Sequence, residues 1–188
     1  LDAEGIEKQI DDHVNCARLA QKAGYDGVEI IGSAGYLIST FLVEKTNLRT
    51  DEYGGSYENR MRFALEVVRR CRAAVGEDFI IIFRIAGMDM LEGGMSWDEV
   101  ALLARELEKA GASVISTHFT WHESAVPTIA TMVPRAAFTS VTARVRKEVS
   151  TEKFLEDALL NIDELNVSIR VRLVTRQACT GELSLIHI

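Results

Sequence analysis

The 188-residue sequence contains 28 acidic and 21 basic side chains, which gives a formal net charge of −7 at pH 7. Because a nucleic-acid-binding protein needs a basic face, this charge balance argues against a nucleic-acid partner. No run approaches the roughly 20 apolar residues of a membrane-spanning helix and no signal peptide is recognisable, so we expect a cytoplasmic protein with no membrane partner.

Three consecutive stretches of the chain repeat the order amphipathic helix, glycine, polar corner and apolar strand. Helices are expected at residues 6–23, 59–75 and 97–110, and the strands that follow them at residues 27–31, 79–85 and 113–117. The helices carry apolar residues at 3–4 spacing, each is followed by a glycine suited to a C-cap, and Ser96 with Glu99 forms a capping box. This alternation predicts an α/β fold with a parallel sheet.

The loops that follow the strands are much longer than the corners that precede them. They are expected at residues 32–56, 87–95 and 119–135, whereas such loops usually take about 2–6 residues. In barrels and open sheets alike, sites lie at the carboxyl ends of the strands. Four residues with suitable chemistry fall there: Tyr36, Arg84, His118 and His122.

Two groups of polar residues have both a structural and a functional interpretation. Arg84 ends the apolar run 79–83, and its charge needs a partner such as Glu29 or a bound ligand. The first loop, read as one long connection, contains a polar and cationic stretch that is either solvated or in contact with a ligand: Lys45, Thr46, Asn47 and Arg49. The three cysteines are scattered without a C-x-x-C pair, so neither a disulfide framework nor a metal site is expected.

The block KTNLRTDEYGGSYENRMRFALEVV, residues 45–68, resembles the old yellow enzyme superfamily of NADH:flavin oxidoreductases, which are built on an FMN-binding (β/α)8 barrel. The segments GYDGVEIIGSAGYLISTFL and WHESAVPTIATMVPRAAF narrow this resemblance to the bacterial 2,4-dienoyl-CoA reductases. Simple ene reductases of the superfamily carry a His/Asn pair where this chain has Ile31 and Ala34. The dienoyl-CoA reductases use a tyrosine from the following Gly-Tyr instead, which here is Tyr36.

The resemblance implies an enzyme that uses NADPH-derived hydride, passed through FAD and an iron–sulfur cluster to FMN, to reduce a 2,4-dienoyl-CoA thioester of the kind met in fatty acid β-oxidation. It implies that Tyr36 delivers a proton, because a phenol of ordinary pKa, about 10, stays protonated at neutral pH. His122, in its Trp-His-Glu context, would assist Tyr36, with His118 as the rival histidine. Arg84 would contact the flavin, and residues 45–49 would contact the acyl-CoA.

The resemblance covers residues 6–149, which corresponds to the third through the sixth helix of the barrel and includes a helix expected at 136–147. We therefore expect a partial barrel domain at 1–149, with the FAD and cluster sites absent from this chain. Residues 150–188 are expected to be an unrelated, frame-shifted or chimeric tail, with a helix at 151–165, a strand at 167–174 and an adaptor-like LSLIHI end. The alternatives are a related ene reductase or amine dehydrogenase, and an inactive truncated product.

Overall fold

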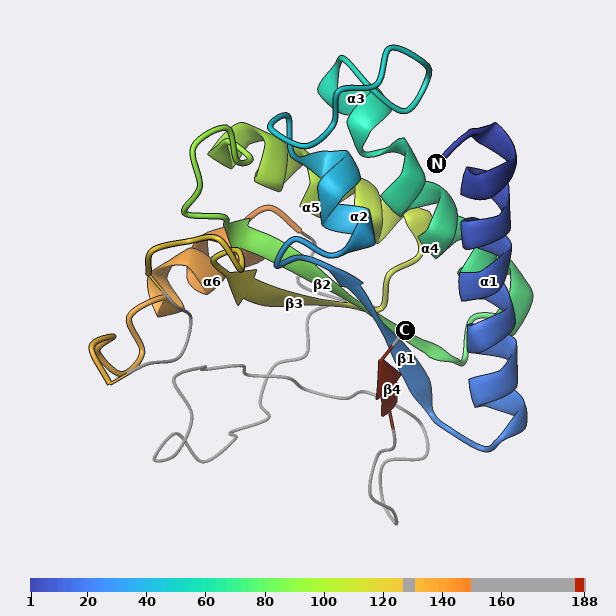
Figure 1. The fold of residues 1–188 in the computed structure, drawn as a ribbon. Helices are drawn as coiled ribbons and strands as arrows, with labels where there is room; N and C mark the ends of the chain where they lie inside the picture. The colour runs from blue at the N-terminus through green and yellow to red at the C-terminus, as the bar shows by residue number, and fades with distance from the viewer. Residues whose placement is uncertain (127–130, 150–184, 188) are drawn as a thin grey trace.

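The computed structural model describes residues 1–126, 131–149 and 185–187 (Figure 1). Along the chain, the elements are α1 (Ala3–Lys22), β1 (Gly27–Gly32), α2 (Leu37–Leu42), α3 (Tyr57–Arg60), α4 (Arg62–Val75), β2 (Ile80–Met88), α5 (Trp97–Ala110), β3 (Val114–Phe119), α6 (Thr139–Arg146) and β4 (Leu185–His187). The three expected helix–strand units are therefore present. No helix in these described ranges is long and apolar enough to cross a membrane.

The strands form one parallel sheet in the order β3-β2-β1-β4. In its register Ile31 of β1 pairs with Arg84 of β2, and Arg84 pairs with Ser116 of β3. Because successive side chains of a strand point to opposite faces, this register puts Glu29, Arg84 and His118 on one face of the sheet. Strand β2 runs three residues beyond its expected end at residue 85, to Met88.

The opposite face of the sheet is covered by helices α1, α4 and α5, which lie together along it in Figure 1. The largest fully buried side chains of this core include Ile30, Ile81, Phe63, Phe83 and Leu103. Phe83 lies so close to β1 that a Cβ added at Gly32 would stand 2.2 Å from its Cζ, so only glycine fits at that position. This packing fixes β1 against β2 just before the loop that carries Tyr36.

The first long loop contains regular structure that the sequence reading missed. Helix α2 buries Ile38, Phe41 and Leu42 against the core, and the short helix α3 begins at a Ser56 cap whose hydroxyl accepts the Asn59 N–H at 3.4 Å. The helix expected at 59–75 is consequently divided into α3 and α4. Helices α2 and α3, with six and four residues, are too short to show a clear apolar period. The sequence therefore predicts a single long connection in their place.

The later expectations have different outcomes. The helix expected at 136–147 is observed as α6, which is shorter at both ends. The helix expected at 151–165 and the strand expected at 167–174 lie outside the described residues. Within the expected tail, Leu185–His187 forms β4 and pairs with Gly27–Glu29 of β1. Cys71 is buried, and this burial raises the pKa of its thiol to about 12, so it is a core residue and not a reactive thiol.

Candidate active site

Two ring side chains from different loops meet at the carboxyl end of the sheet. Tyr36 lies in the loop after β1 and His122 in the loop after β3, and their ring centroids are 5.0 Å apart with an interplanar angle of 81°. Tyr36 is 55% exposed, so its ring borders solvent rather than the core. A phenol in edge contact with an imidazole at the strand ends is a pair suited to proton transfer to a bound ligand.

A tight turn aims Tyr36 out of the sheet. Ala34 and Gly35 both have positive φ angles, 64° and 94°, and the Tyr36 N–H donates to the Ser33 carbonyl at 3.2 Å. The hydroxyl of Ser39, in α2, accepts the Gly35 N–H at 3.0 Å and donates to the Ser33 and Tyr36 carbonyls at 3.0 and 2.7 Å. Ser39 therefore closes this turn, a role that its position in the sequence did not reveal.

A buried carboxylate joins the loop after β2 to the loop that carries His122. Asp89, one residue past β2, accepts hydrogen bonds from Nε1 of Trp121 and from the Met95 N–H, both at 2.7 Å. Burial raises the pKa of Asp89 above its usual range, although these two donors oppose the shift. Trp121 in turn lies against Gly35, since a Cβ added there would stand 3.1 Å from its Cε3. Neither Asp89 nor Trp121 was expected to matter from the sequence.

Backbone strain is concentrated in the same three loops. A non-glycine residue with positive φ closely follows each of β1, β2 and β3: Ala34 at 64°, Met90 at 52° and Thr120 at 72°. For a β-branched residue such as Thr120 this conformation is a genuine outlier, and it persists only where surrounding contacts hold it. Strain of this kind clusters at active sites and ligand-binding loops.

Arg84 lies in β2, on the sheet face that the helices leave uncovered. It donates to Glu29 from Nε and Nη2 at 2.9 and 2.6 Å, so the ion pair considered from the sequence is present. In the sheet, Arg84 pairs with Ser116 of β3. His118 comes two residues after Ser116 and therefore lies on the same face of the sheet as Arg84. Burial, and then the charges of Arg84 and His122, lower the pKa of His118, which favours a neutral imidazole.

These residues fit the flavin that the resemblance implies. The Glu29 contact uses only Nε and Nη2 of Arg84, and 33% of the Arg84 side chain is still exposed. A guanidinium with a remaining donor edge, next to a neutral imidazole, suits the electronegative edge of a planar ring system. Arg84 and His118 are the residues that would border such a ring.

Of the four residues expected to contact the acyl-CoA, two use their side chains for hydrogen bonds within the loop. Asn47 is buried, and its Nδ2 donates to the carbonyls of Phe41 and Tyr53 at 2.6 and 2.8 Å. The Thr46 hydroxyl donates to the Thr40 carbonyl at 2.9 Å. Both side chains hold the segment after α2 in shape.

The two cations of that segment differ in their contacts. Arg49 forms a bidentate ion pair with Asp51 and donates to the Leu1 carbonyl at 2.6 Å, so its guanidinium is largely occupied. The hydrogen bonds to Arg49 lower the pKa of Asp51. Lys45 is exposed, and its backbone N–H donates to the Gly93 carbonyl at 3.3 Å. Lys45 is thus the cation of this segment whose charge is directed to solvent, next to the loop after β2.

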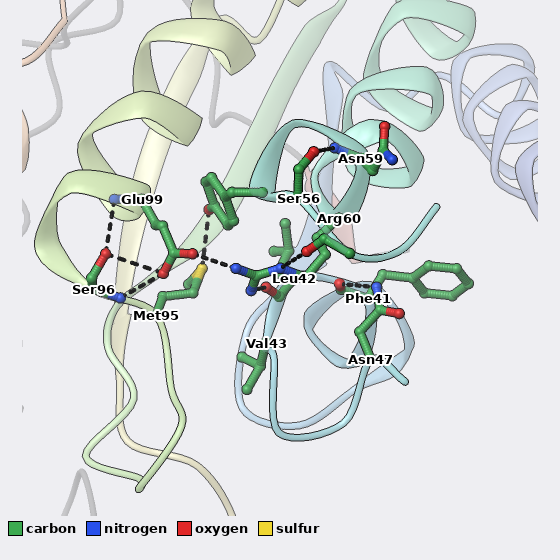
Figure 2. A network of polar contacts seen from close by, with 12 residues as sticks. Phe41, Leu42, Val43, Asn47, Ser56, Asn59, Arg60, Met95, Ser96 and Glu99 are labelled. Atoms are coloured by element: carbon green, nitrogen blue, oxygen red, sulfur yellow. Dashed lines mark hydrogen bonds and ion pairs between the residues drawn. The ribbon is translucent and has the colours of Figure 1, made fainter. Parts of the chain in front are cut away.

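A buried arginine attaches the segment containing α2 and α3 to α5 (Figure 2). Arg60 donates to the carbonyls of Leu42 and Gly55 at 2.5 and 3.3 Å and forms an ion pair with Glu99. Glu99 also completes the predicted capping box with Ser96, whose backbone N–H donates to Oε2 of Glu99 at 2.8 Å. This network holds α2, which directly follows Tyr36, in place relative to the start of α5.

Comparison with known proteins places these loops in a family. The sequence profile of the NADH:flavin oxidoreductase / NADH oxidase family matches residues 1–168. The chain is 43% identical over 150 residues to a metal reductase of Desulforamulus reducens, covering 80% of this chain and 22% of that relative. The chain therefore spans less than a quarter of this relative, and the family profile continues beyond residue 149.

Two solved structures agree with this assignment. A complex of 2-naphthoyl-CoA reductase with 2-naphthoyl-CoA superposes with a TM-score of 0.74 at 35% identity, over 78% of this chain and 22% of that one. The old yellow enzyme homologue of Zymomonas mobilis superposes with a TM-score of 0.64 at 29% identity, over 80% and 41%. The expected fold class, a segment of a flavin-binding (β/α)8 barrel, is confirmed. The chain belongs to the NADH:flavin oxidoreductase / NADH oxidase family.

Proposed function

We propose that this chain supplies the proton-donating loops of an FMN-dependent reductase that acts on a carbon–carbon double bond conjugated to a CoA thioester, with 2,4-dienoyl-CoA as the substrate. The observation that carries the proposal is the edge contact between Tyr36 and His122 at the strand ends. The similarity to 2-naphthoyl-CoA reductase, whose ligand is also a conjugated thioester, supports the same substrate class.

Reduction of such a substrate adds a hydride to one carbon of the conjugated system and a proton to another. FMN, when bound, would supply the hydride, and NADPH would be the reductant, through FAD and an iron–sulfur cluster in the complete enzyme. In this proposal the Tyr36 hydroxyl donates the proton, and His122 stabilises the phenolate that remains. The exposed ammonium of Lys45 binds a phosphate of CoA.

Stopped-flow reoxidation of the reduced full-length enzyme tests this proposal. Flavin absorbance should recover rapidly with a 2,4-dienoyl-CoA and slowly with cyclohexenone, an enone without CoA. The enzyme should also fail to be reduced by histamine or trimethylamine. Fast reoxidation by the simple enone would instead indicate a xenobiotic ene reductase, and reduction by an amine would indicate an amine dehydrogenase. Either result would refute the proposed substrate class.

A further inference from the structure

We propose that Asp89 is a positioning residue that holds the indole of Trp121 and thereby sets the placement of Tyr36 relative to His122. The inference rests on the proposed function for the role of that pair, but its geometry stands on contacts of this chain alone. Three βα loops that are distant in sequence meet at these residues. Asp89 follows β2, Trp121 follows β3, and the Tyr36 turn follows β1.

Asp89 uses two of its oxygen atoms to join its own loop to the loop after β3 and the third to close its own loop on itself. Oδ1 accepts from Nε1 of Trp121 at 2.7 Å, and Oδ2 accepts from the Met95 N–H at 2.7 Å. The backbone carbonyl of Asp89 accepts from the Trp121 N–H at 3.1 Å. With Asp89 only 3% exposed and Trp121 only 5% exposed, water cannot easily replace these bonds. Trp121 is therefore held by Asp89 at both its backbone N–H and its ring N–H.

The fixed indole touches the turn that carries Tyr36. Its six-membered ring lies against Gly35, where an added Cβ would come within 3.1 Å of Cε3. The residue after Trp121 is His122, whose backbone N–H donates to the Ala34 carbonyl at 3.4 Å. One tryptophan thus supports the backbone before Tyr36 on one side and leads directly into His122 on the other.

The strained backbone gives a reason for this support. A residue with a positive φ angle stands next to each residue of this contact. Ala34 precedes Gly35, Met90 follows Asp89, and Thr120 precedes Trp121. Left-handed conformations are unfavourable for a residue with a Cβ, so each loop would relax if its contacts were lost. A displacement of about 1 Å between reacting groups can reduce a rate roughly 100-fold. The Asp89–Trp121 bond is placed to prevent that relaxation.

A double-mutant cycle separates positioning from a merely structural role. Trp121→Phe keeps an aromatic ring but removes the Nε1–H that donates to Asp89. Asp89→Asn keeps the size of the side chain but replaces one of its two acceptor oxygens with an NH2 group. In the full-length, flavin-loaded enzyme, we expect each variant to slow reoxidation by 2,4-dienoyl-CoA at least 10-fold, with flavin reduction by NADPH unchanged. In a Tyr36→Phe background the same changes should slow reoxidation less than 2-fold, because they act through Tyr36.

Trp97→Phe is the matched control, since Trp97 lies at the start of α5, where its ring packs against the guanidinium of Arg144. It should leave reoxidation unchanged. Equal slowing by Trp121→Phe with and without the Tyr36 hydroxyl would overturn the inference. If Asp89→Asn does not fold, the cycle with Trp121→Phe decides alone.

A second measurement does not depend on the substrate. In enzyme labelled with ¹³C-histidine, Trp121→Phe should shift the His122 imidazole resonances, whereas Trp97→Phe should not. Unchanged His122 resonances in Trp121→Phe would refute the positioning role, whatever the substrate. Shifted resonances in an enzyme that no thioester reoxidises would instead refute the proposed function and leave the positioning role supported.

Discussion

Arg84 of β2 and Glu29 of β1 form a bidentate ion pair across adjacent strands, with N–O distances of 2.9 and 2.6 Å. The pair is asymmetric, because 33% of the Arg84 side chain but only 7% of the Glu29 side chain is exposed. The carboxylate is therefore the buried partner and depends on the arginine for its counter-charge. The arginine keeps donor capacity for a ligand.

Because only Glu29 is fully buried, substitutions at the two positions can separate the contribution of Arg84 to stability from a role at the flavin. Arg84→Met should destabilise the protein by about 2 kcal/mol, which is less than the roughly 3–5 kcal/mol of a fully buried pair because Arg84 is partly exposed. Arg84→Met with Glu29→Gln should regain most of that stability, as measured by urea unfolding. If Arg84 borders the flavin, the double variant should still show a lowered flavin reduction potential. A potential equal to that of the parent protein would remove Arg84 from the cofactor site.

The proposed proton donor gives a prediction that is specific to one half-reaction. Tyr36→Phe should slow flavin reoxidation by a 2,4-dienoyl-CoA roughly 10²–10⁴-fold, the usual contribution of general acid catalysis, and leave flavin reduction by NADPH near normal. Both steps can be followed by stopped-flow absorbance. Tyr25→Phe, on the corner before β1, is the matched control and should change neither rate. Unchanged reoxidation in Tyr36→Phe would exclude this role.

The elements that the sequence predicted well are those with a long period and clear ends. The α5 capping box of Ser96 and Glu99 and the Gly111 C-cap were readable because each uses residues three positions apart or adjacent to a helix end. The segment holding α2 and α3 was not, since its shape depends on Arg60 and Asn47. Apart from the ion pair of Arg60 with Glu99, 39 positions away, their partners are backbone carbonyls, which carry no residue-specific signal.

The candidate site shows the same division. Tyr36 and His122 could be placed at strand ends because parallel strands bring their carboxyl ends to one edge. The Asp89–Trp121 bond joins residues 32 positions apart in two loops, and no periodicity marks such a pair. Asp89 stands four residues past the expected end of β2, so its burial and its need for donors became apparent only from the longer observed strand.

The Arg60 network should be essential for the stability of the first loop. Arg60→Met leaves Glu99 and two carbonyls without their donor, and with Arg60 only 6% exposed we expect a loss of about 3 kcal/mol. For a protein of this size that corresponds to a melting temperature lower by roughly 6–12 °C. Arg69→Met removes an exposed ion pair with Glu66 and should cost less than about 0.5 kcal/mol. Similar melting temperatures for the two variants would contradict this assignment.

The last prediction concerns His118, whose imidazole shares a sheet face with Arg84. Because burial and the neighbouring charge of Arg84 lower the pKa of His118 below its usual value of 6.5, the unfolded chain binds the proton more readily than the folded protein. His118 therefore contributes stability that is fully present above pH 6.5 and is lost as the pH falls from there toward the folded-state pKa. Each unit of difference between the two pKa values corresponds to about 1.4 kcal/mol.

His118→Asn should remove this contribution to the pH dependence. We expect the parent protein to lose more of its free energy of unfolding between pH 7.5 and pH 5.5 than His118→Asn does, as measured by urea unfolding at both pH values. His13→Asn, on α1 and away from the sheet, controls for the loss of an imidazole in general. The same loss of stability in the parent and in His118→Asn would show that this imidazole is not held neutral by its surroundings, and the arrangement of a neutral histidine beside Arg84 at the cofactor face would have to be abandoned.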